Sequence, residues 1–365
     1  MVKVLQIFPQ MNNAGTEKVI MTLFRNIDRS KVMFDFLIQK EGELDNEIKR
    51  LGGTINKIEF INKKQYYEEM LRFLEKSEYK IIHIHTQGNM ELILKAGRQA
   101  NIPCRIIHSH NSRQDLPKFI KILNLKRDLQ ISRYATDFFA CSSDAAKWLF
   151  PFDYKKAKII YNAININNFK FELNERVNLR NELGIKTNEK VVIEVGRFAK
   201  QKNHNKFVKI AEQIIKKDDN VRFILVGKGP LEEKIKKVVY KKNMTEKFIF
   251  LGNRSDVNKI LMAADLFLFP SLHEGLGIVL VEAQFSGLKC ITSNNVPDEA
   301  DIGLGLMKKI DINKSDKYWS EMVLRELNND IDRRSIINNS FNNNYSIENT
   351  IDDIQKFYIR KEDKE

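Results

Sequence analysis

The sequence "LFLFPSLHEGLGIVLVEAQFSG", residues 266–287, contains a short apolar strand, a turn with two glycines and an apolar helix. The run at residues 266–269 is typical of a buried strand, and the glycines mark the turn that follows it. A buried strand that leads through a turn into a helix is one βα unit of a parallel sheet. Two carboxylates interrupt this unit, Glu274 in the turn and Glu282 in the helix, although burial of an unpaired charge is costly. We therefore expect that something at this unit, such as a ligand, needs them.

The same alternation of strands and helices continues in both directions from this unit. In the first half, "KVLQIF", "FDFLIQ", "KIIHIHT" and "RIIHSH" alternate with amphipathic stretches. The pattern loosens around residues 165–190, and a second series then begins with "VVIEVGR", "VRFILVG" and "FIFLG". This organisation predicts an α/β protein with two doubly wound parallel-sheet domains, residues 1–165 and 166–345. A closing helix at about 346–365 can pack back on either domain, and we group it with the first.

The charge of the chain favours anionic partners. Its 365 residues include 61 Lys and Arg against 48 Asp and Glu, which gives a formal net charge of +13. This charge suits phosphate ligands, nucleic acid or an anionic membrane surface, and a compositional bias of the source genome explains it equally well. No apolar run is long enough to cross a bilayer, and the first residues are typical of a strand rather than a signal peptide. We therefore expect a cytoplasmic protein.

Neither a metal nor an organic cofactor is expected. The cysteines Cys104, Cys141 and Cys290 are scattered and lack the spacing of metal ligands or of a disulfide framework. The turn in "FILVGKGPLEEKI" lacks the third glycine of the dinucleotide fingerprint, which argues against a nicotinamide or flavin site.

Unusual residues follow several predicted strands, at the places where ligands bind in such folds. Arg197 and Lys202 follow "VVIEVG" and can hold a diphosphate, and neutralise a departing one, without a metal. Gly15 lies in a polar loop after the first strand, where it lets the main chain approach an anion. His110, in "RIIHSHNSR", can contact a ligand. Purely structural roles stay open for all four, namely solvated cations, a plain turn and a buried hydrogen-bonded histidine.

The turn in the opening stretch predicts a nucleotide site. Gly275 and Gly277 let main-chain amides at the helix start face a phosphate. Glu282, about two turns into the helix, can accept hydrogen bonds from a ribose diol. Such bonds would satisfy a buried carboxylate.

Taken together, these motifs resemble a known family. The spacing of Glu274 and Glu282 in "PSLHEGLGIVLVEA", "GRFAKQKN" upstream and "HSHN" in the first half are similar to those of the retaining glycosyltransferases of family four. The "HSHN" form is similar to capsular and exopolysaccharide transferases. The resemblance covers nearly the whole chain and implies the GT-B architecture, in which two Rossmann-like domains face a central cleft. The first domain would then bind the acceptor and the second the nucleotide-sugar.

The resemblance also implies roles for individual residues. Arg197, Lys202, Glu274 and His110 would act at the reacting centre, with the two cations on the donor diphosphate and His110 on the sugar near the reacting carbon. Glu274 would hold the transferred sugar and the phosphates together with main-chain amides. Gly15 would also contact the diphosphate, Asn253 and Arg254 would contact the base, and Glu282 would contact the ribose. The full set implied to bind the nucleotide-sugar is Gly15, Arg197, Lys202, Asn253, Arg254, Glu274, Leu276, Gly277, Ile278, Val279 and Glu282.

The implied reaction is a retaining, metal-independent transfer of a hexose or N-acetylhexosamine from a UDP-sugar. Its acceptor would be a glycan, lipid-linked in the synthesis of capsule, exopolysaccharide or O-antigen. The leaving phosphate oxygen would accept the proton of the acceptor, while Arg197, Lys202 and helix amides stabilise the departing diphosphate. An Asp-x-Asp occurs at residues 330–332, but it falls in a predicted late helical region rather than after a strand, so we do not expect a metal there.

One stretch of the first half indicates where an acceptor can be met. Residues 117–133, "PKFIKILNLKRDLQISR", combine Phe119, Ile120, Leu123 and Leu125 with several Lys and Arg side chains. Such a stretch can rest on the inner face of an anionic membrane and meet a lipid-linked glycan there. An ordinary packed helix with a solvated face explains the same pattern.

Two other functions stay open. A sugar-nucleotide epimerase can have the same architecture, although the pairing of Glu274 and Glu282 with Arg197 and Lys202 argues against it. A nucleic-acid-binding protein would use the charge of +13, but no recognition motif accompanies that charge. We therefore do not expect nucleic acid among the partners.

Overall fold

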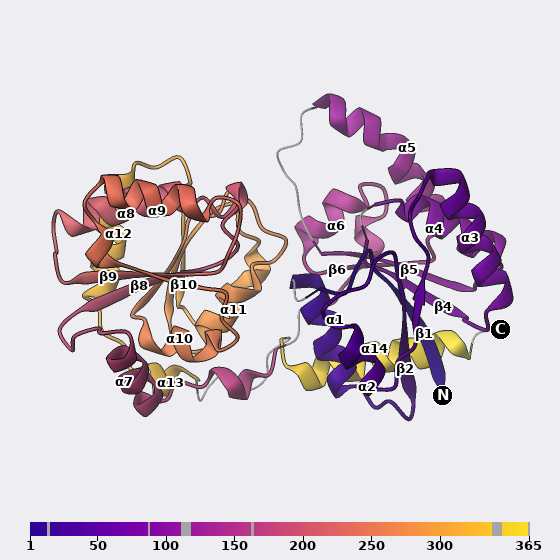
Figure 1. Ribbon diagram of the computed structural model, residues 1–365, viewed down its shortest axis with the longest axis horizontal. Helices are drawn as coiled ribbons and strands as arrows, with labels where there is room; N and C mark the ends of the chain where they lie inside the picture. The colour runs from indigo at the N-terminus through magenta and orange to yellow at the C-terminus, as the bar shows by residue number, and fades with distance from the viewer. Residues whose placement is uncertain (13–14, 87, 111–117, 162–163, 338–344, 364–365) are drawn as a thin grey trace. The chain divides into compact units, whose positions relative to one another are not determined.

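The computed structural model in Figure 1 describes residues 1–12, 15–86, 88–110, 118–161, 164–337 and 345–363, without the side chains of 118–123 and 337. The chain forms two compact units, which we describe separately. The first unit comprises Met1–Ile164 and Asn344–Glu365, and the second comprises Asn165–Asn343. None of the helices in the described part is both long and apolar enough to span a membrane.

The first unit is built on a seven-stranded parallel sheet. Its strands are β1 (Val2–Ile7), β2 (Val32–Ile38), β3 (Ile55–Lys57), β4 (Ile81–Ile84), β5 (Cys104–Ser109), β6 (Asp137–Ala140) and β7 (Lys158–Ile159). They are ordered β3-β2-β1-β4-β5-β6-β7, and each pair of neighbours is parallel. The strand order therefore reverses between β1 and β4, where Gln6 pairs in register with His83. In a doubly wound sheet the ligand crevice lies at the carboxyl end of such a reversal.

Helices cover both faces of this sheet. They are α1 (Gly15–Asn26), α2 (Asp45–Arg50), α3 (Lys63–Lys76), α4 (Met90–Gln99), α5 (Lys118–Tyr134), α6 (Ser143–Leu149) and α14 (Ile347–Glu362), with the 3-10 turn η1 (Tyr154–Lys156). Figure 1 shows α1, α2 and α14 on one side of the sheet and α3 and α4 on the other. Phe24 of α1, Phe34 of β2 and Tyr358 of α14 are fully buried in one core cluster. The last helix is thus part of the first unit's core.

The second unit repeats the plan with six parallel strands. They are β8 (Lys190–Val195), β9 (Val221–Val226), β10 (Phe248–Gly252), β11 (Leu266–Phe269), β12 (Lys289–Ser293) and β13 (Met307–Ile310). Their order is β10-β9-β8-β11-β12-β13, so the strand order reverses between β8 and β11. The helices are α7 (Leu173–Glu182), α8 (His204–Ile215), α9 (Glu232–Lys241), α10 (Val257–Ala263), α11 (Ile278–Phe285), α12 (Asp316–Leu327) and α13 (Arg333–Ile337), with 3-10 turns η2 (Ile166–Phe169), η3 (Lys200–Lys202), η4 (Thr245–Lys247) and η5 (Asp298–Ala300).

Two apolar clusters hold this second sheet between its helices. One joins the sheet to α8, α9 and α12, with Trp319 fully buried, and the other joins it to α10 and α11. Figure 1 shows the same two helical layers on opposite faces. Adjacent strand residues such as Val191 and Val192 point into opposite clusters, which is why these strands are apolar throughout.

The predicted fold class, two doubly wound parallel sheets, is confirmed. Strands β3 and β13 were missed, and both are short strands at an edge of a sheet. Their residues are mostly half-buried or exposed, and β13 carries two lysines. Edge strands of this kind lack the apolar run that marks a central strand, so periodicity does not detect them.

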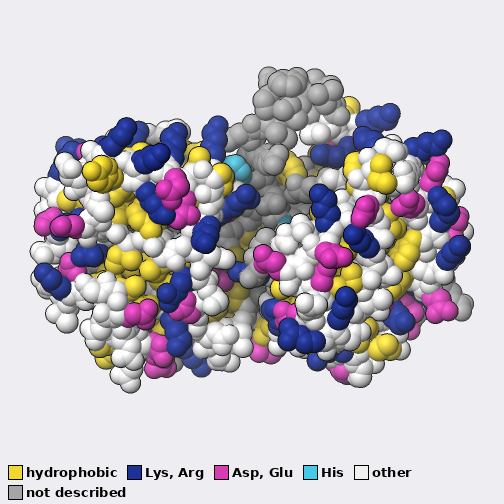
Figure 2. All heavy atoms as spheres, in the orientation of Figure 1, with side chains coloured by type: hydrophobic (Ala, Val, Ile, Leu, Met, Phe, Trp, Pro, Cys, Tyr) yellow, Lys and Arg dark blue, Asp and Glu magenta, His cyan; other side chains and the backbone are white. Residues whose placement is uncertain are grey.

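Positive and negative side chains are mixed on the surface. Over the face seen in Figure 2, Lys and Arg lie among Asp and Glu on both units instead of gathering in one basic area. Exposed ion pairs are found in both units, such as Lys236 with Glu233 and Lys356 with Asp352. Among the described side chains on this face, Lys and Arg therefore form no stripe of the kind that tracks a nucleic-acid backbone.

We expect Ile354→Ala in α14 to lower the free energy of unfolding of the first unit by about 2–5 kcal/mol, because it leaves a cavity in the core. Ile354 is fully buried among residues of β1, β2 and α1. Urea unfolding followed by circular dichroism measures the change. Lys356→Ala on the exposed side of the same helix is the control, with an expected change within about 0.5 kcal/mol. Equal stability of the two variants would show that α14 adds little to the core.

Candidate active site at the strand-order reversals

The loops after β8 and β11 meet at the strand-order reversal of the second sheet. Lys202, in the loop after β8, places its Nζ 2.8 Å from Oε1 of Glu274, in the loop after β11. Both side chains are largely buried, and the Lys202 Nζ also lies 4.5 Å from the centre of the Phe269 ring. The structure thus joins two predicted site residues that are far apart in sequence. Their ion pair offsets charge that would be costly to bury alone.

Neighbouring residues hold these two loops together. The main-chain oxygen of Gln201 accepts a hydrogen bond from the amide of Leu272 at 2.8 Å. The Gln201 side chain donates to the carbonyl of His273 at 2.9 Å and lies 3.3 Å from Glu274 Oε2. Asn203 Nδ2 donates to the carbonyl of Pro270 at 3.1 Å. The residues on either side of Lys202 therefore fix its position by binding the opposite loop.

Glycines allow the main chains of neighbouring loops to approach closely at the carboxyl ends of these strands. A Cβ on Gly227, at the end of β9, would lie 2.2 Å from the carbonyl oxygen of Gly196, and its φ is +133°. The "VGKG" turn therefore packs against the loop after β8. Gly277 has φ +79° and forms the N-cap of α11, a conformation that residues with a side chain rarely adopt.

The start of α11 presents main-chain amides beside this ion pair. Leu276 and Val279 are buried, and Gly277 and Ile278 are half-buried, so the apolar side chains anchor the turn while its backbone remains partly accessible. The first amides of a helix have no partner within the helix and favour an anion. Arg197 lies exposed just after β8, in the same loop as Lys202. Cations and amides therefore accompany the same strand-order reversal.

The burial expected for Glu282 is wrong. Glu282 lies in the second turn of α11 and is half-buried, whereas Val281 and Ala283 on either side are fully buried. Consecutive residues of a helix point in different directions, so Glu282 can be partly exposed although both neighbours are buried. The buried carboxylate of the opening stretch is Glu274, which is 4% exposed, and Lys202 supplies its countercharge.

Asn253 and Arg254 follow β10, at the edge of the sheet. Asn253 is exposed, and Arg254 is half-buried. The Arg254 Nε and Nη2 each lie 2.7 Å from a carboxylate oxygen of Asp256, and this hydrogen bonding raises the pKa of Arg254. Two strands separate β10 from β11, so the structure does not join these residues directly to the ion pair of Lys202 and Glu274.

Sequence reasoning missed a second buried pair in the same unit, Glu194 and His204. Glu194 of β8 is fully buried, and its Oε1 lies 3.6 Å from Nε2 of His204, which stacks on Phe198. Neither carboxylate oxygen of Glu194 has a hydrogen-bond partner among the described residues. Burial raises the pKa of Glu194 well above its usual value, with Lys202 opposing and Glu274 reinforcing the rise. A lone carboxylate inside the apolar run "VVIEV" was the available signal.

The first unit places Gly15 and His110 after its own strands. Gly15 is the exposed first residue of α1, and a Cβ there would meet no described atom within 4 Å. Packing within the described part therefore does not require a glycine at this position. His110 follows β5, and its Nε2 lies 2.8 Å from Nδ1 of His85, which follows β4. Burial lowers the pKa of His110 to about 3.

Four histidines gather at this end of the first sheet. His83, His85 and His108 offer ring nitrogens that lie within 4.8 Å of one another, the one group of metal-ligand type found in the described part of the chain. Both nitrogens of His85 already bind protein atoms, and Nδ1 of His83 lies 2.6 Å from the Tyr358 hydroxyl. A metal would have to displace these bonds. The expectation of a metal-free site stays a prediction.

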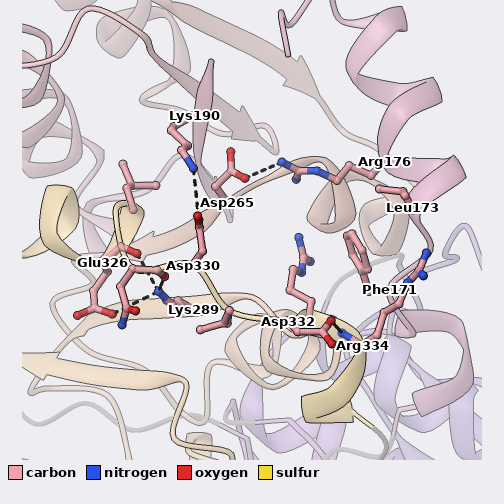
Figure 3. Close-up of a pocket in the computed structure, with 14 residues that line it drawn as sticks. Phe171, Leu173, Arg176, Lys190, Asp265, Lys289, Glu326, Asp330, Asp332 and Arg334 are labelled. Atoms are coloured by element: carbon pink, nitrogen blue, oxygen red, sulfur yellow. Dashed lines mark hydrogen bonds and ion pairs between the residues drawn. The ribbon is translucent and has the colours of Figure 1, made fainter. Parts of the chain in front are cut away.

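The pocket in Figure 3 lies at the amino ends of strands of the second sheet, whereas Lys202 and Glu274 lie beyond the carboxyl ends. Its volume is about 360 Å³, and Lys190, Asp265 and Lys289 line it from the amino ends of β8, β11 and β12. Asp330 and Asp332 stand in the loop between α12 and α13, which corrects the helical placement expected for them. Asp330 lies 3.5 Å from Lys190, so this Asp-x-Asp forms an ion pair in the pocket.

Known proteins are similar to this chain in sequence or in fold. Residues 175–341 match the family model described as glycosyl transferases group 1. The putative glycosyltransferase EpsF of Bacillus subtilis is 30% identical over 339 residues, which cover 88% of this chain and 87% of that protein. The UDP-Gal:alpha-D-GlcNAc-diphosphoundecaprenol alpha-1,3-galactosyltransferase of Escherichia coli is 26% identical over 379 residues, which cover 97% and 95%. The crystal structure of Anabaena HepE in complex with UDP has the same fold, with a TM-score of 0.80 at 17% identity over 98% of this chain and 99% of that one.

We expect Glu194→Gln to raise the free energy of unfolding at neutral pH by about 1 kcal/mol or more. The folded state holds a carboxyl whose pKa is raised from 4.5, while the unfolded chain ionises it freely. The carboxyl therefore favours folding most below pH 4.5 and loses this contribution as the pH rises. The gain from the substitution should shrink as the pH falls toward 4.5. Urea unfolding across this range measures it.

The exposed Glu246 of the same unit provides the control, because Glu246→Gln should change stability by less than about 0.5 kcal/mol. A Glu194→Gln variant that is less stable than wild type at neutral pH would show that the ionised carboxylate has a stabilising partner.

Proposed function

The chain belongs to the group 1 glycosyl transferases, and we propose that it transfers a hexose or N-acetylhexosamine from a UDP-sugar to a lipid-linked glycan, with retention of anomeric configuration and without a metal. The observation that carries this proposal is the ion pair of Lys202 and Glu274 beside the start of α11, at the strand-order reversal of the second sheet. A cation, a carboxylate and helix amides there match the phosphates and hydroxyls of a nucleotide-sugar.

In this proposal the donor diphosphate replaces Glu274 as the partner of Lys202. Arg197, in the same loop and exposed, binds the diphosphate as well, and the first amides of α11 complete the anion site. Glu274, released from Lys202, accepts hydrogen bonds from hydroxyls of the transferred sugar. The two cations and the amides then stabilise the departing diphosphate, a task that a divalent metal performs in other enzymes.

The nucleoside would extend from this site along α11 and toward β10. Glu282 is half-buried on the second turn of α11, so its carboxylate can accept hydrogen bonds from the ribose diol without a full desolvation cost. The backbone at residues 276–279 is proposed to face the phosphates, and Asn253 and Arg254 to meet the base. The UDP in the Anabaena HepE complex supports the choice of nucleotide.

The first unit is proposed to bind the acceptor and to complete the donor site with Gly15 and His110. The described part of α5 exposes Leu125 and Leu129, at 46% and 53%, next to Lys126 on the same helix. These side chains can rest on the inner face of an anionic membrane, where a lipid-linked glycan is available. Phe119, Ile120 and Leu123, the other apolar residues of that predicted stretch, have side chains outside the described residues. The Escherichia coli relative, named for a diphosphoundecaprenol acceptor, supports this choice of partner.

We expect Lys202→Met and Glu282→Gln to remove most of the stabilisation that UDP gives the folded protein. A ligand present at about 100 times its Kd adds about 2.7 kcal/mol to stability, so wild type should show a clear rise in Tm. Lys202→Met also leaves Glu274 without its countercharge, so each variant is compared with and without UDP. Thermal unfolding with UDP, GDP and NAD measures the shifts.

Lys209→Met is the matched control, because Lys209 is an exposed lysine in the second turn of α8. Its UDP-dependent shift should equal that of wild type. Normal UDP shifts in both Lys202→Met and Glu282→Gln would overturn the site, and no shift of wild type with any of the nucleotides would contradict the proposed donor.

We expect one of UDP-glucose, UDP-galactose and UDP-N-acetylglucosamine to release UDP slowly with water and faster with a lipid-linked acceptor. The product should keep the anomeric configuration of the donor, as read by NMR couplings of the new linkage. EDTA should leave the rate unchanged, because the site supplies its own cations. An inverted linkage, or a rate lost with EDTA and restored by Mg²⁺, would contradict the mechanism. A UDP-sugar altered at one carbon without UDP release would support the epimerase instead.

A further inference from the structure

Gln6, His85 and His110 form a hydrogen-bonded chain across the strand-order reversal of the first sheet. Nε2 of His85 lies 2.8 Å from the side-chain oxygen of Gln6, and Nδ1 of His85 lies 2.8 Å from Nε2 of His110. Gln6 belongs to β1, while His85 and His110 follow β4 and β5. Because β1, β4 and β5 are neighbours in the sheet, their carboxyl ends bring the three side chains together.

Both histidines of this chain are neutral at physiological pH. Gln6 is fully buried and His85 is 6% exposed. Burial is the largest cause that lowers the pKa of His85 well below its usual value, with the neighbouring histidines adding to it, and burial lowers the pKa of His110 to about 3. A neutral imidazole has one nitrogen that donates a hydrogen bond and one that accepts. Each histidine therefore donates from one side and accepts on the other.

The hydrogen bond to the Gln6 oxygen determines which ring nitrogen of His85, and in turn of His110, carries the proton. This oxygen only accepts, so Nε2 of His85 carries a proton and donates to it. Nδ1 of the neutral His85 must then accept, so Nε2 of His110 carries a proton and donates to it. Nδ1 of His110 is left with a lone pair. Stacking of the His85 ring on Phe8, with centres 4.5 Å apart, holds the middle of the chain in place.

The lone pair on His110 Nδ1 has no donor within the described part of the protein, although the atom is buried. A buried acceptor without a donor costs about 1–3 kcal/mol, which a ligand can recover. His110 stands directly after a strand of a parallel sheet, where ligands of such sheets bind. A sugar hydroxyl is the donor that the proposed function brings to this place.

We propose that Gln6 and His85 are positioning residues that hold His110 in the tautomer with its proton on Nε2, so that Nδ1 accepts a hydrogen bond from a hydroxyl of the sugar substrate. This inference rests on the proposed function for the identity of the ligand, but the tautomer itself does not depend on it. His110 then orients a hydroxyl and does not remove its proton. The proton released by the acceptor goes to the leaving diphosphate in the proposed reaction.

The tautomer can be measured directly on the full-length protein. Long-range ¹H–¹⁵N NMR distinguishes a protonated from an unprotonated ring nitrogen, and the spectrum of His110→Asn assigns the His110 signals. At neutral pH we expect His110 to be neutral, with Nε2 protonated and Nδ1 unprotonated. A proton on Nδ1, or an imidazolium, would overturn the proposal.

A pair of variants tests the role of the chain. Gln6→Leu removes the acceptor at its start, so His110 should become a mixture of tautomers, and sugar transfer should fall about twofold or more, in step with the fraction of His110 whose Nδ1 becomes protonated. His108→Phe is the control: His108 is buried at 3.9 Å from His110, ring centre to ring centre, but neither of its nitrogens has a partner in the described part. Its His110 should keep the single tautomer.

An unchanged tautomer and rate in Gln6→Leu would refute the positioning role. If Gln6→Leu does not fold, as judged by circular dichroism, the wild-type spectrum still tests the tautomer, and His85→Phe, which keeps the stack on Phe8, replaces it. The two proposals also fail differently. Expected tautomers without transfer from any UDP-sugar would contradict the proposed function alone, and transfer with the opposite tautomer would contradict this inference alone.

Discussion

The reversal of strand order in each parallel sheet is the constraint on which the rest of the structure depends. Strands on either side of a reversal send their connections to opposite faces of the sheet, so the loops at their carboxyl ends diverge and leave a crevice. In the second unit this place lies between β8 and β11, and in the first between β1 and β4. Lys202 and Glu274 meet at one of these places, and Gln6 and His85 meet at the other. Chain topology, and not sequence proximity, makes both pairs.

The second unit concentrates charge where burial makes charge expensive. Lys202 and Glu274 offset each other, and removing one partner of a buried ion pair typically costs about 3–5 kcal/mol because the remaining charge is no longer compensated. Glu194 lies close enough for both to influence its pKa, and it has no hydrogen-bond partner in the described part. Stability would favour an apolar residue at Glu194. Functional sites often keep residues that lower stability, and a destabilising buried carboxylate next to the proposed diphosphate site fits that pattern.

Sequence periodicity predicted the two doubly wound sheets because central parallel strands are apolar on both faces, as "VVIEV" and "LFLF" are. It missed β3 and β13, whose edge positions require no such run. At the candidate site, glycine turns and the strand-end positions of Lys202 and Glu274 were visible in the sequence. The burial of Glu274 rather than Glu282 was not, since it depends on how α11 rotates against its sheet. The sequence did not reveal the roles of Gln6 and Glu194, because the partners of a lone polar residue in a buried strand are known only once the neighbouring strands are known.

The two reversals differ in chemistry, and each suits a different kind of ligand group, a charged diphosphate in the second unit and a neutral hydroxyl in the first. The second unit gathers Lys202, Arg197 and helix amides, groups that gain from a charged diphosphate. The first gathers neutral, buried side chains whose donors and acceptors are assigned by one another. A hydroxyl donates a single, directional hydrogen bond, so its recognition depends more on how the acceptor is oriented than on charge. A protonated histidine at His110 would donate from both nitrogens and could no longer accept from a hydroxyl. The proposed recognition therefore requires burial, because burial keeps these imidazoles neutral. Helix α14 contributes to that burial, since its Tyr358 packs on His83 and hydrogen-bonds to it.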